Sequence, residues 1–386
     1  MQPPRITWAN TLRGFAAVSV ALGAHMIVAV WSAPEIVAGA VRLSPEYAVL
    51  GPTPAWAEPF LLVDWGALGV CLFFLISGLV IPRSLERQSR LGFVVGRGLR
   101  ILPTYAVGYC VVWTVVLLNS HFTETTAPTI PGLFAGMIPG LGEISGVAVV
   151  PNVEWTLIIE LGFYVVTLIA FRALVAFWWA PVLVGLACAP TVVICNNLLQ
   201  SLSGGPTAGV LSLIRLTAVY LPIIMIGALL SRHKKGQDSR GLLTAAVAVL
   251  AAITYFTMLQ PGAGILGVGV STEYRLTYWA MIPVFVAVWS WSPKLNWGPV
   301  GGFFANISYS LYVSHLAVSV SVILVLIHIG WAPILATMAG FATATAVAWV
   351  IHVVVEVPTH RLGRRLTRRL SPQTHPTADQ VPIGGH

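Results

Sequence analysis

Residues 14–31 have the sequence Gly-Phe-Ala-Ala-Val-Ser-Val-Ala-Leu-Gly-Ala-His-Met-Ile-Val-Ala-Val-Trp, an apolar run with a single ionisable side chain, His25. A helix needs about 20 such residues to cross a hydrocarbon core of about 30 Å, so this run predicts a transmembrane helix. The run is longer than the usual hydrophobic core of a secretory signal, although Ala38-Gly39-Ala40 resembles a cleavage site. We therefore interpret it as a retained span, with a cleaved signal as the alternative.

The rest of the chain repeats this pattern. Hydrophobic residues make up 57% of its 386 residues and charged residues only 9%, whereas soluble domains carry about 25% charged residues. This composition excludes a soluble globular enzyme. Ten apolar runs, each ending at a charge cluster or a Pro/Gly-rich break, begin near Gly14, Leu61, Ile101, Trp155, Leu174, Ala208, Gly241, Tyr274, Gly302 and Pro333. We predict an all-α polytopic membrane protein with about ten transmembrane helices.

The charged residues predict the orientation of these spans. If the N-terminus is cytoplasmic, 18 of the 21 lysines and arginines fall in inner segments, as the positive-inside rule requires. Both termini are then cytoplasmic, and the net charge of +8 reflects topology in a cell membrane, not binding of nucleic acid. We expect residues 1–370 to form one transmembrane domain and residues 371–386 a disordered cytoplasmic tail. The four cysteines form no CxxC pair, so no disulfide scaffold or metal site is predicted.

A few ionisable residues lie inside the predicted spans, where each costs at least about 2.5 kcal/mol. His25, about 18 Å beyond Arg13 on a helix, is a candidate general base, and the alternative is a histidine bonded across helices. Glu160 is a candidate to orient an imidazole or to receive a substrate hydroxyl, with an ion pair to Arg215 as its alternative. Glu356 either takes part in the chemistry or pairs with nearby arginines.

Arg97 and Arg100 lie in the most basic inner segment, three residues apart and therefore on one helical face. Guanidinium groups bind phosphates in bidentate fashion. We expect this pair to bind the phosphates of a cytosolic donor, and the alternative is that it only follows the positive-inside rule.

Six motifs in order resemble the acyltransferase-3 family of integral-membrane O-acyltransferases, over about Asn10 to Leu362. The motifs are Leu12-Arg13-Gly14 leading to His25, Phe73-Phe74-Leu75-Ile76-Ser77-Gly78, Arg97 to Tyr105, Trp155 to Glu160 followed by Phe163-Tyr164, Ile307 to His315, and Glu356-Val357-Pro358. The resemblance implies transfer of an acyl group, usually acetyl, from cytosolic acyl-CoA to a hydroxyl of a carbohydrate or glycosylated metabolite. Acyl-CoA would be a cosubstrate, with no permanently bound cofactor.

The resemblance and the membrane depths together give a set of candidate site residues. The candidate catalytic residues are His25, Glu160 and Glu356. We expect donor binding by Arg13, Arg97, Arg100 and Tyr105. We expect acceptor binding by Trp155, Tyr164, Ser308, Tyr309 and His315. A carboxylate, from Glu160 or Glu356, is expected to fix the tautomer of His25.

One departure from the family pattern concerns the first span. Eleven residues separate Arg13 from His25, where the family usually has ten. One extra residue rotates a side chain by about 100° on a regular helix, so either the helix is distorted or the pairing of the two residues is lost.

Two other functions remain possible from the residues. The same buried charges would suit a multispan transporter with a substrate or proton path, or a membrane scaffold in which polar groups only bond helix to helix. The chain also contains His233 followed by Asp238, a spacing used by soluble acyltransferases. Because this pattern sits in a short basic loop, we interpret it as chance.

Overall fold

The computed structural model describes residues 7–85, 88–233, 239–264, 270–291 and 298–370. The predicted disordered tail, residues 371–386, lies outside this part, as does Asp238 of the discounted motif. The first half of the chain forms α1 (Thr7–Val18), the π-helix η1 (Ser19–Ala29), α2 (Val30–Ser32), α3 (Pro34–Ala40), the short 3-10 helices η2 (Pro45–Ala48) and η3 (Glu58–Leu62), α4 (Trp65–Leu85), α5 (Arg90–Phe122), α6 (Ile130–Gly136), α7 (Leu141–Ser145) and α8 (Glu154–Ile169).

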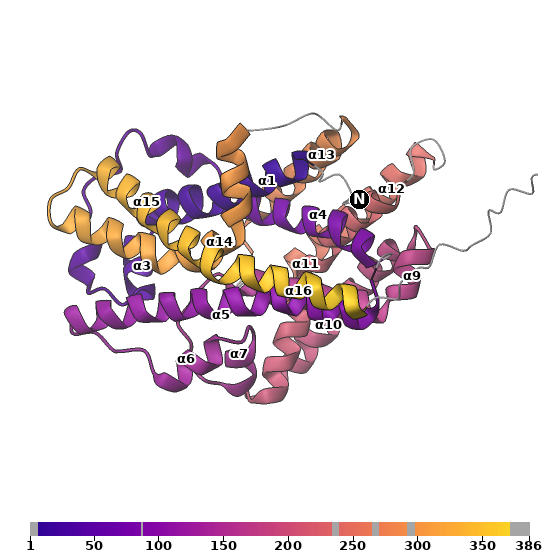
Figure 1. Cartoon of the computed structure of the whole chain (residues 1–386), viewed down its shortest axis with the longest axis horizontal. Coiled ribbons are helices and arrows are strands. Elements are labelled where there is room, and N and C mark those ends of the chain that lie inside the picture. The colour runs from indigo at the N-terminus through magenta and orange to yellow at the C-terminus, as the bar shows by residue number, and fades with distance from the viewer. Residues whose placement is uncertain (1–6, 86–87, 234–238, 265–269, 292–297, 371–386) are drawn as a thin grey trace, which may run out of the picture.

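The second half is also helical. It forms α9 (Phe171–Ala176), α10 (Ala180–Gln200), α11 (Pro206–Arg232), α12 (Arg240–Leu259), α13 (Thr272–Trp291), α14 (Gly298–His328), α15 (Pro333–Ile351), the π-helix η5 (His352–Glu356) and α16 (Val357–Leu370). Figure 1 shows the long helices running mostly along the longest axis of the molecule, as expected for a bundle that crosses a bilayer.

The predicted all-α polytopic membrane fold is confirmed. Among the described residues, eight helices are long and apolar enough to cross a membrane. The other two predicted spans fall on α8 and α13. Helix α8 has 16 residues, about 24 Å of rise, and α13 carries Glu273 and Arg275 in its first turn. Crossing by these two helices stays a prediction.

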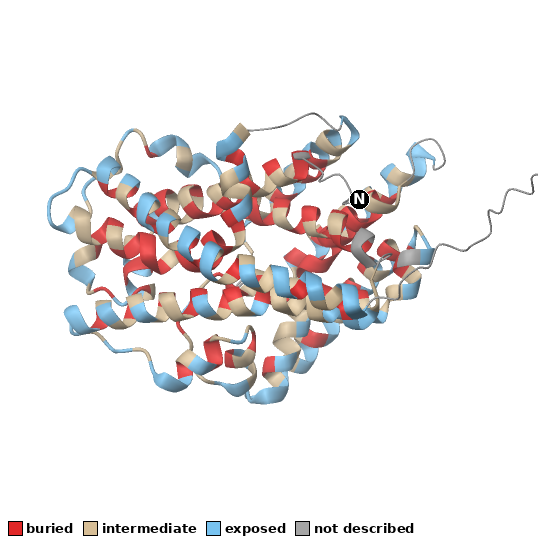
Figure 2. Cartoon of the chain, viewed as in Figure 1, coloured by how far each residue is buried: buried red, intermediate tan, exposed pale blue. Residues whose placement is uncertain are grey.

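The outer faces of the peripheral helices are apolar. Figure 2 shows exposed positions along the surface of the bundle. On α10 these include Leu183, Leu186, Ile194 and Leu198, all more than 40% exposed. Side chains of this kind would be unfavourable in water over so long a stretch but suit contact with lipid chains.

Two glycines allow the central helices to cross with their backbones in contact. A Cβ atom at Gly78 of α4 would collide with the carbonyl oxygen of Ile224 in α11, and one at Gly227 of α11 would collide with that of Leu75. Small residues permit such close approach between membrane helices. The glycine that ends the Phe73–Gly78 motif therefore has a packing role.

The π-helix η1 answers the question raised by the long spacing between Arg13 and His25. The chain leaves α-geometry at Ser19 and returns to it at Val30. Because π-helical hydrogen bonds join residues five apart instead of four, such a segment accommodates an extra residue without turning the rest of the helix away. Of the two outcomes expected from the sequence, the helix is distorted.

Helix α5 begins earlier than the sequence predicted. The third span was expected near Ile101, but the side chain of Ser89 accepts a hydrogen bond from the backbone N–H of Gly92 and caps the helix at Arg90. Arg97 and Arg100 therefore lie inside a 33-residue helix and not in a loop. This first part of α5 packs against α16, and Figure 1 shows the two helices side by side.

Candidate functional site

Two histidines from distant parts of the chain meet inside the bundle. Nδ1 of His25, on η1, lies 3.0 Å from Nε2 of His315, on α14. The ring centroids are 4.9 Å apart and the rings are tilted by 57°. His315 is fully buried, whereas His25 retains partial exposure. The His25 ring thus faces another side chain of the bundle and not the lipid.

The backbone around the pair determines which ring nitrogens carry hydrogen. Nδ1 of His315 lies 3.0 Å from the carbonyl oxygen of Leu311 and 2.9 Å from that of Tyr312, and Nδ1 of His25 lies 3.0 Å from that of Val20. Carbonyl oxygens only accept, so each Nδ1 is the N–H donor. His25 then donates to both Val20 and Nε2 of His315, and its own Nε2 carries the free lone pair.

Three arginines gather on the side of the bundle where α1 begins. Arg13 of α1 is within electrostatic range of Arg97 and Arg100 of α5, and also of Glu160 and Tyr164 of α8. All three arginines are partly buried. Like charges repel strongly in such a place, so this group favours the binding of anions.

Arg97 is held by aromatic side chains. Its Cζ atom lies 5.6 Å from the ring centroid of Phe93 and 5.6 Å from that of Tyr164, distances at which a guanidinium is attracted to a ring face. The hydroxyl of Tyr164 in turn donates to Oε1 of Glu160. These contacts fix the position of the guanidinium and its neighbours before any ligand binds.

Tyr309 connects the arginine group to the rest of α14. Its hydroxyl donates to the carbonyl oxygen of Ile101 at 3.0 Å, and it lies within electrostatic range of Glu160, Glu356 and Arg100. One turn further along α14, Tyr312 accepts a hydrogen bond of 2.8 Å from Thr156. A row of polar groups therefore leads from the arginines towards the histidine pair.

Glu356 is 4% exposed and takes part in a separate set of hydrogen bonds. Its Oε2 accepts from the hydroxyl of Ser310 at 2.7 Å and from Nδ1 of His352 at 2.9 Å. The sequence left open a pairing with nearby arginines, and the partners are instead a hydroxyl and an imidazole. The π-helix η5, which ends at Glu356, brings this carboxylate towards α14.

Three predicted site residues make their contacts elsewhere. Tyr105 is fully buried and donates to Glu154 at the start of α8, at 2.8 Å. Trp155 packs against the ring of Tyr220 in α11, 5.4 Å between centroids. The hydroxyl of Ser308 donates to a carbonyl oxygen of its own helix. Their predicted roles in binding donor or acceptor gain no support from these contacts.

Two expectations about partners need correction. The expected carboxylate partner of His25 is replaced by His315, because within the described chain Glu160 bonds Tyr164 and Glu356 bonds Ser310 and His352. Arg215 does not pair with Glu160 but donates to the side-chain oxygen of Asn196 at 3.3 Å.

Sequence reasoning missed some members of the site. Tyr312 lies three residues before His315 on the same helical face, and its ring centroid is 6.2 Å from that of His315. The three-residue separation in the sequence was the signal that could have identified Tyr312. Thr156 and His352 gave no such signal, because their partners lie on other helices or depend on the π-helix η5. Glu154 was not distinguished from the other acidic residues near the outer loops.

Comparison with known proteins gives one match. The model of the acyltransferase-3 family, described as an acyltransferase domain, matches residues 6–353. No curated protein and no solved structure matches the chain significantly. The match runs from α1 through α15 to the second residue of η5, and it includes His25, His315 and the arginine group but not Glu356.

Proposed function

Because this chain belongs to the acyltransferase-3 family and is a membrane acyltransferase, we propose that it moves an acyl group, acetyl in the simplest case, from acyl-CoA to a hydroxyl of a carbohydrate or glycosylated metabolite. The observation that carries this proposal is the His25–His315 pair. It leaves Nε2 of His25 unprotonated in the neutral ring, which is the state a general base requires.

The proposed reaction needs a single proton acceptor. Nε2 of His25 takes the proton of the acceptor hydroxyl as its oxygen attacks the thioester carbonyl. The carbon–sulfur bond then breaks, the ester forms, and the imidazolium returns the proton to the departing thiolate, so that free CoA is released. Nε2 of His315 accepts from Nδ1–H of His25 throughout, which keeps the ring in the productive tautomer and stabilises the imidazolium.

The arginine group is the proposed donor end of the site. Arg13, Arg97 and Arg100 lie together with one carboxylate, Glu160, in range, which favours an anionic ligand with bidentate phosphates. Arg13 precedes His25 by twelve residues along α1 and η1. The donor would extend along this path, with its thioester beside the imidazole pair.

The acceptor would lie next to the same pair. Tyr164, Tyr309 and Tyr312 offer rings and hydroxyls between the arginines and His315. Aromatic rings with polar edges suit the apolar faces and hydroxyls of sugars. The partial exposure of His25 supports access for a hydroxyl group.

The test uses purified protein in nanodiscs with radiolabelled acetyl-CoA, a mixture of candidate glycan acceptors, and a thiol reagent that detects free CoA. Wild-type protein should release CoA and label an acceptor. The transfer rate of His25→Ala should be at least about 10²-fold lower, because general acid–base catalysis usually contributes a factor of this size. His121→Ala, an exposed histidine on α5, is the matched control. Equal transfer by His25→Ala would refute the catalytic role, and solute movement without CoA release would favour a transporter.

A further inference from the structure

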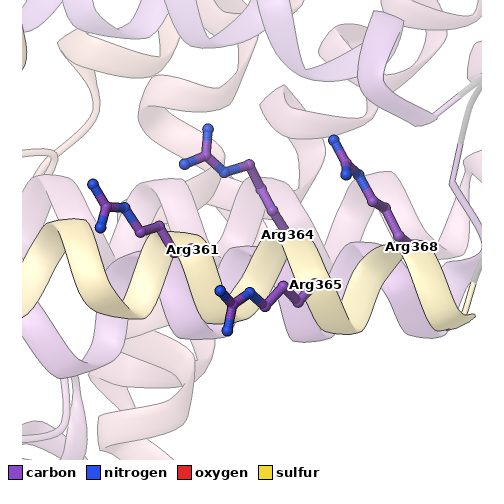
Figure 3. A pocket seen from close by; sticks show the side chains of 4 residues that line it. All are labelled: Arg361, Arg364, Arg365 and Arg368. Atoms are coloured by element: carbon purple, nitrogen blue, oxygen red, sulfur yellow. The ribbon is translucent and has the colours of Figure 1, made fainter.

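Helix α16 carries a row of arginines on one face. Arg361, Arg364, Arg365 and Arg368 line an open cleft, and Figure 3 shows their side chains extending from the helix. The spacings of three, four and seven residues place the four on a single stripe. No acidic residue occurs between Val357 and Leu370.

This arrangement is unfavourable unless an anion binds to it. Like charges three or four residues apart on a helix repel one another, and within the described residues none of these four arginines forms an ion pair. All four are exposed, so they present their guanidinium groups to a ligand. Planar guanidinium forks favour phosphate over other anions because they donate two parallel hydrogen bonds.

The row approaches the arginine group described above at Arg364, through His360. Antiparallel packing of α16 on α5 is fixed by Thr367, whose hydroxyl donates to the carbonyl oxygen of Gly92 at 3.1 Å, and by Gly363, which faces Leu99. His360, one turn before Arg364, is within electrostatic range of Arg364 and also of Arg97 and Arg100.

His360 also has an unsatisfied group. Its Nε2 atom is buried and has no hydrogen-bond partner among the described residues. Buried polar atoms in proteins almost always have a partner, so an atom left over between two sets of arginines indicates a polar ligand at this place.

The length of the last helix favours a soluble phosphate ligand over lipid headgroups. From Pro333 to Arg368 the helix rises about 50 Å, whereas a bilayer with its headgroups is about 40–45 Å thick. Figure 1 shows α16 lying along the long axis of the molecule. A helix that starts at the outer surface would therefore bring Arg368 past the headgroups into water, where a nucleotide is the available phosphate.

We propose that the arginine row of α16 binds the 3′-phosphate at the nucleotide end of acyl-CoA, while Arg97 and Arg100 bind the diphosphate where the pantetheine arm begins. This inference rests on the proposed function for the identity of the donor. It assigns recognition of the donor to two places, the row outside the bundle and the arginine group inside it.

The test compares three donors, acetyl-CoA, 3′-dephospho-acetyl-CoA and S-acetyl-pantetheine, in nanodiscs of neutral lipid. The combined variant Arg361→Gln, Arg364→Gln, Arg365→Gln and Arg368→Gln should raise KM for acetyl-CoA at least about tenfold, since several charge-assisted hydrogen bonds are lost. Its KM for S-acetyl-pantetheine and its kcat should be unchanged. Arg172→Gln, which removes one exposed charge from another helix, should behave as wild type.

The four corresponding lysine substitutions keep the charge that orients the chain in the membrane. This second variant should insert normally and still lose discrimination between acetyl-CoA and its 3′-dephospho form, because an ammonium lacks the bidentate fork. Calorimetric titration of CoA into wild-type and variant protein measures the affinity of the row for CoA independently of catalysis. The proposed function fails if the wild-type protein transfers acetyl from none of the donors. In that case, loss of CoA binding in the glutamine variant would still support the assignment of the row as a CoA-binding site.

Two outcomes overturn the proposal. One is an unchanged preference for acetyl-CoA over 3′-dephospho-acetyl-CoA in the glutamine variant. The other is a loss of activity in that variant that appears only in nanodiscs of anionic lipid and affects all three donors equally, which would assign the row to lipid headgroups.

Discussion

Nε2 of His315 lies 3.0 Å from Nδ1 of His25, although the two residues are 290 positions apart in the chain. Each ring has its Nδ1–H directed at backbone carbonyl oxygens. The backbone of two helices therefore sets the tautomer of both rings. A neutral imidazole replaces the carboxylate that supports the base in many other catalytic sites.

The first prediction concerns His315 as a positioning residue. His315→Ala removes one of the two acceptors for Nδ1–H of His25, so the ring loses the side chain that orients it and stabilises its imidazolium form. We expect kcat to fall on the order of 10²-fold while KM for acyl-CoA changes little, measured by steady-state transfer. His315→Gln supplies an amide oxygen as acceptor and should restore part of kcat. Loss of CoA binding in both variants would instead indicate a purely structural role.

The second prediction concerns the π-helix η1. Deleting Leu22 leaves ten residues between Arg13 and His25, and a regular α-helix then presents the histidine to the same neighbour. We expect transfer activity within about threefold of wild type. Inserting one alanine after Gly14 should rotate His25 by about 100° and abolish transfer. If the deletion and the insertion reduced transfer activity equally, the π-helix would have a role beyond accommodating one extra residue.

The third prediction concerns the crossing of α4 and α11. Gly78→Leu places side-chain atoms where the carbonyl oxygen of Ile224 lies, and overpacking of this kind costs about 1–3 kcal/mol or more. The thermal unfolding temperature in detergent should fall and the yield of inserted protein should drop. Gly302→Ala, on a helix with open space around it, is the control and should be neutral or stabilising. An unaltered unfolding temperature for Gly78→Leu would contradict the close crossing.

The fourth prediction concerns the inner arginines. Arg97→Ala combined with Arg100→Ala should raise KM for acyl-CoA by about tenfold or more, because charge-assisted hydrogen bonds to phosphate are lost. Arg97→Lys alone should give an intermediate value, since lysine keeps the charge but not the fork or the ring contacts. Arg172→Ala removes an exposed charge elsewhere and serves as control. KM values equal to wild type in the double variant would refute the donor-end assignment.

The sequence predicted a large part of the fold and singled out His25 as a candidate general base. The apolar runs, such as residues 14–31, fixed the class because only lipid tolerates them. His25 stood out because an ionisable group is costly in such a run. The apolar run near Ile101 did not indicate where α5 begins, because the cap at Ser89 extends the helix eleven residues beyond that run.

The partners inside the bundle could not be predicted in this way. Hydropathy gives the position of a residue along a helix, but not the rotation of that helix about its axis or which neighbour it meets. The carboxylates Glu160 and Glu356 have suitable depths, and yet they bond Tyr164, Ser310 and His352.

By itself, the amino-acid sequence determined a helical, lipid-embedded chain with a histidine inside the first span and arginines near one end, because these follow from local apolarity and charge. The tertiary structure alone decided that the histidine is supported by His315, that the extra residue is absorbed by η1, and that α16 places its arginines beside α5. Those outcomes depend on how helices rotate and pack against one another, and the packing energy is shared among residues far apart in the chain.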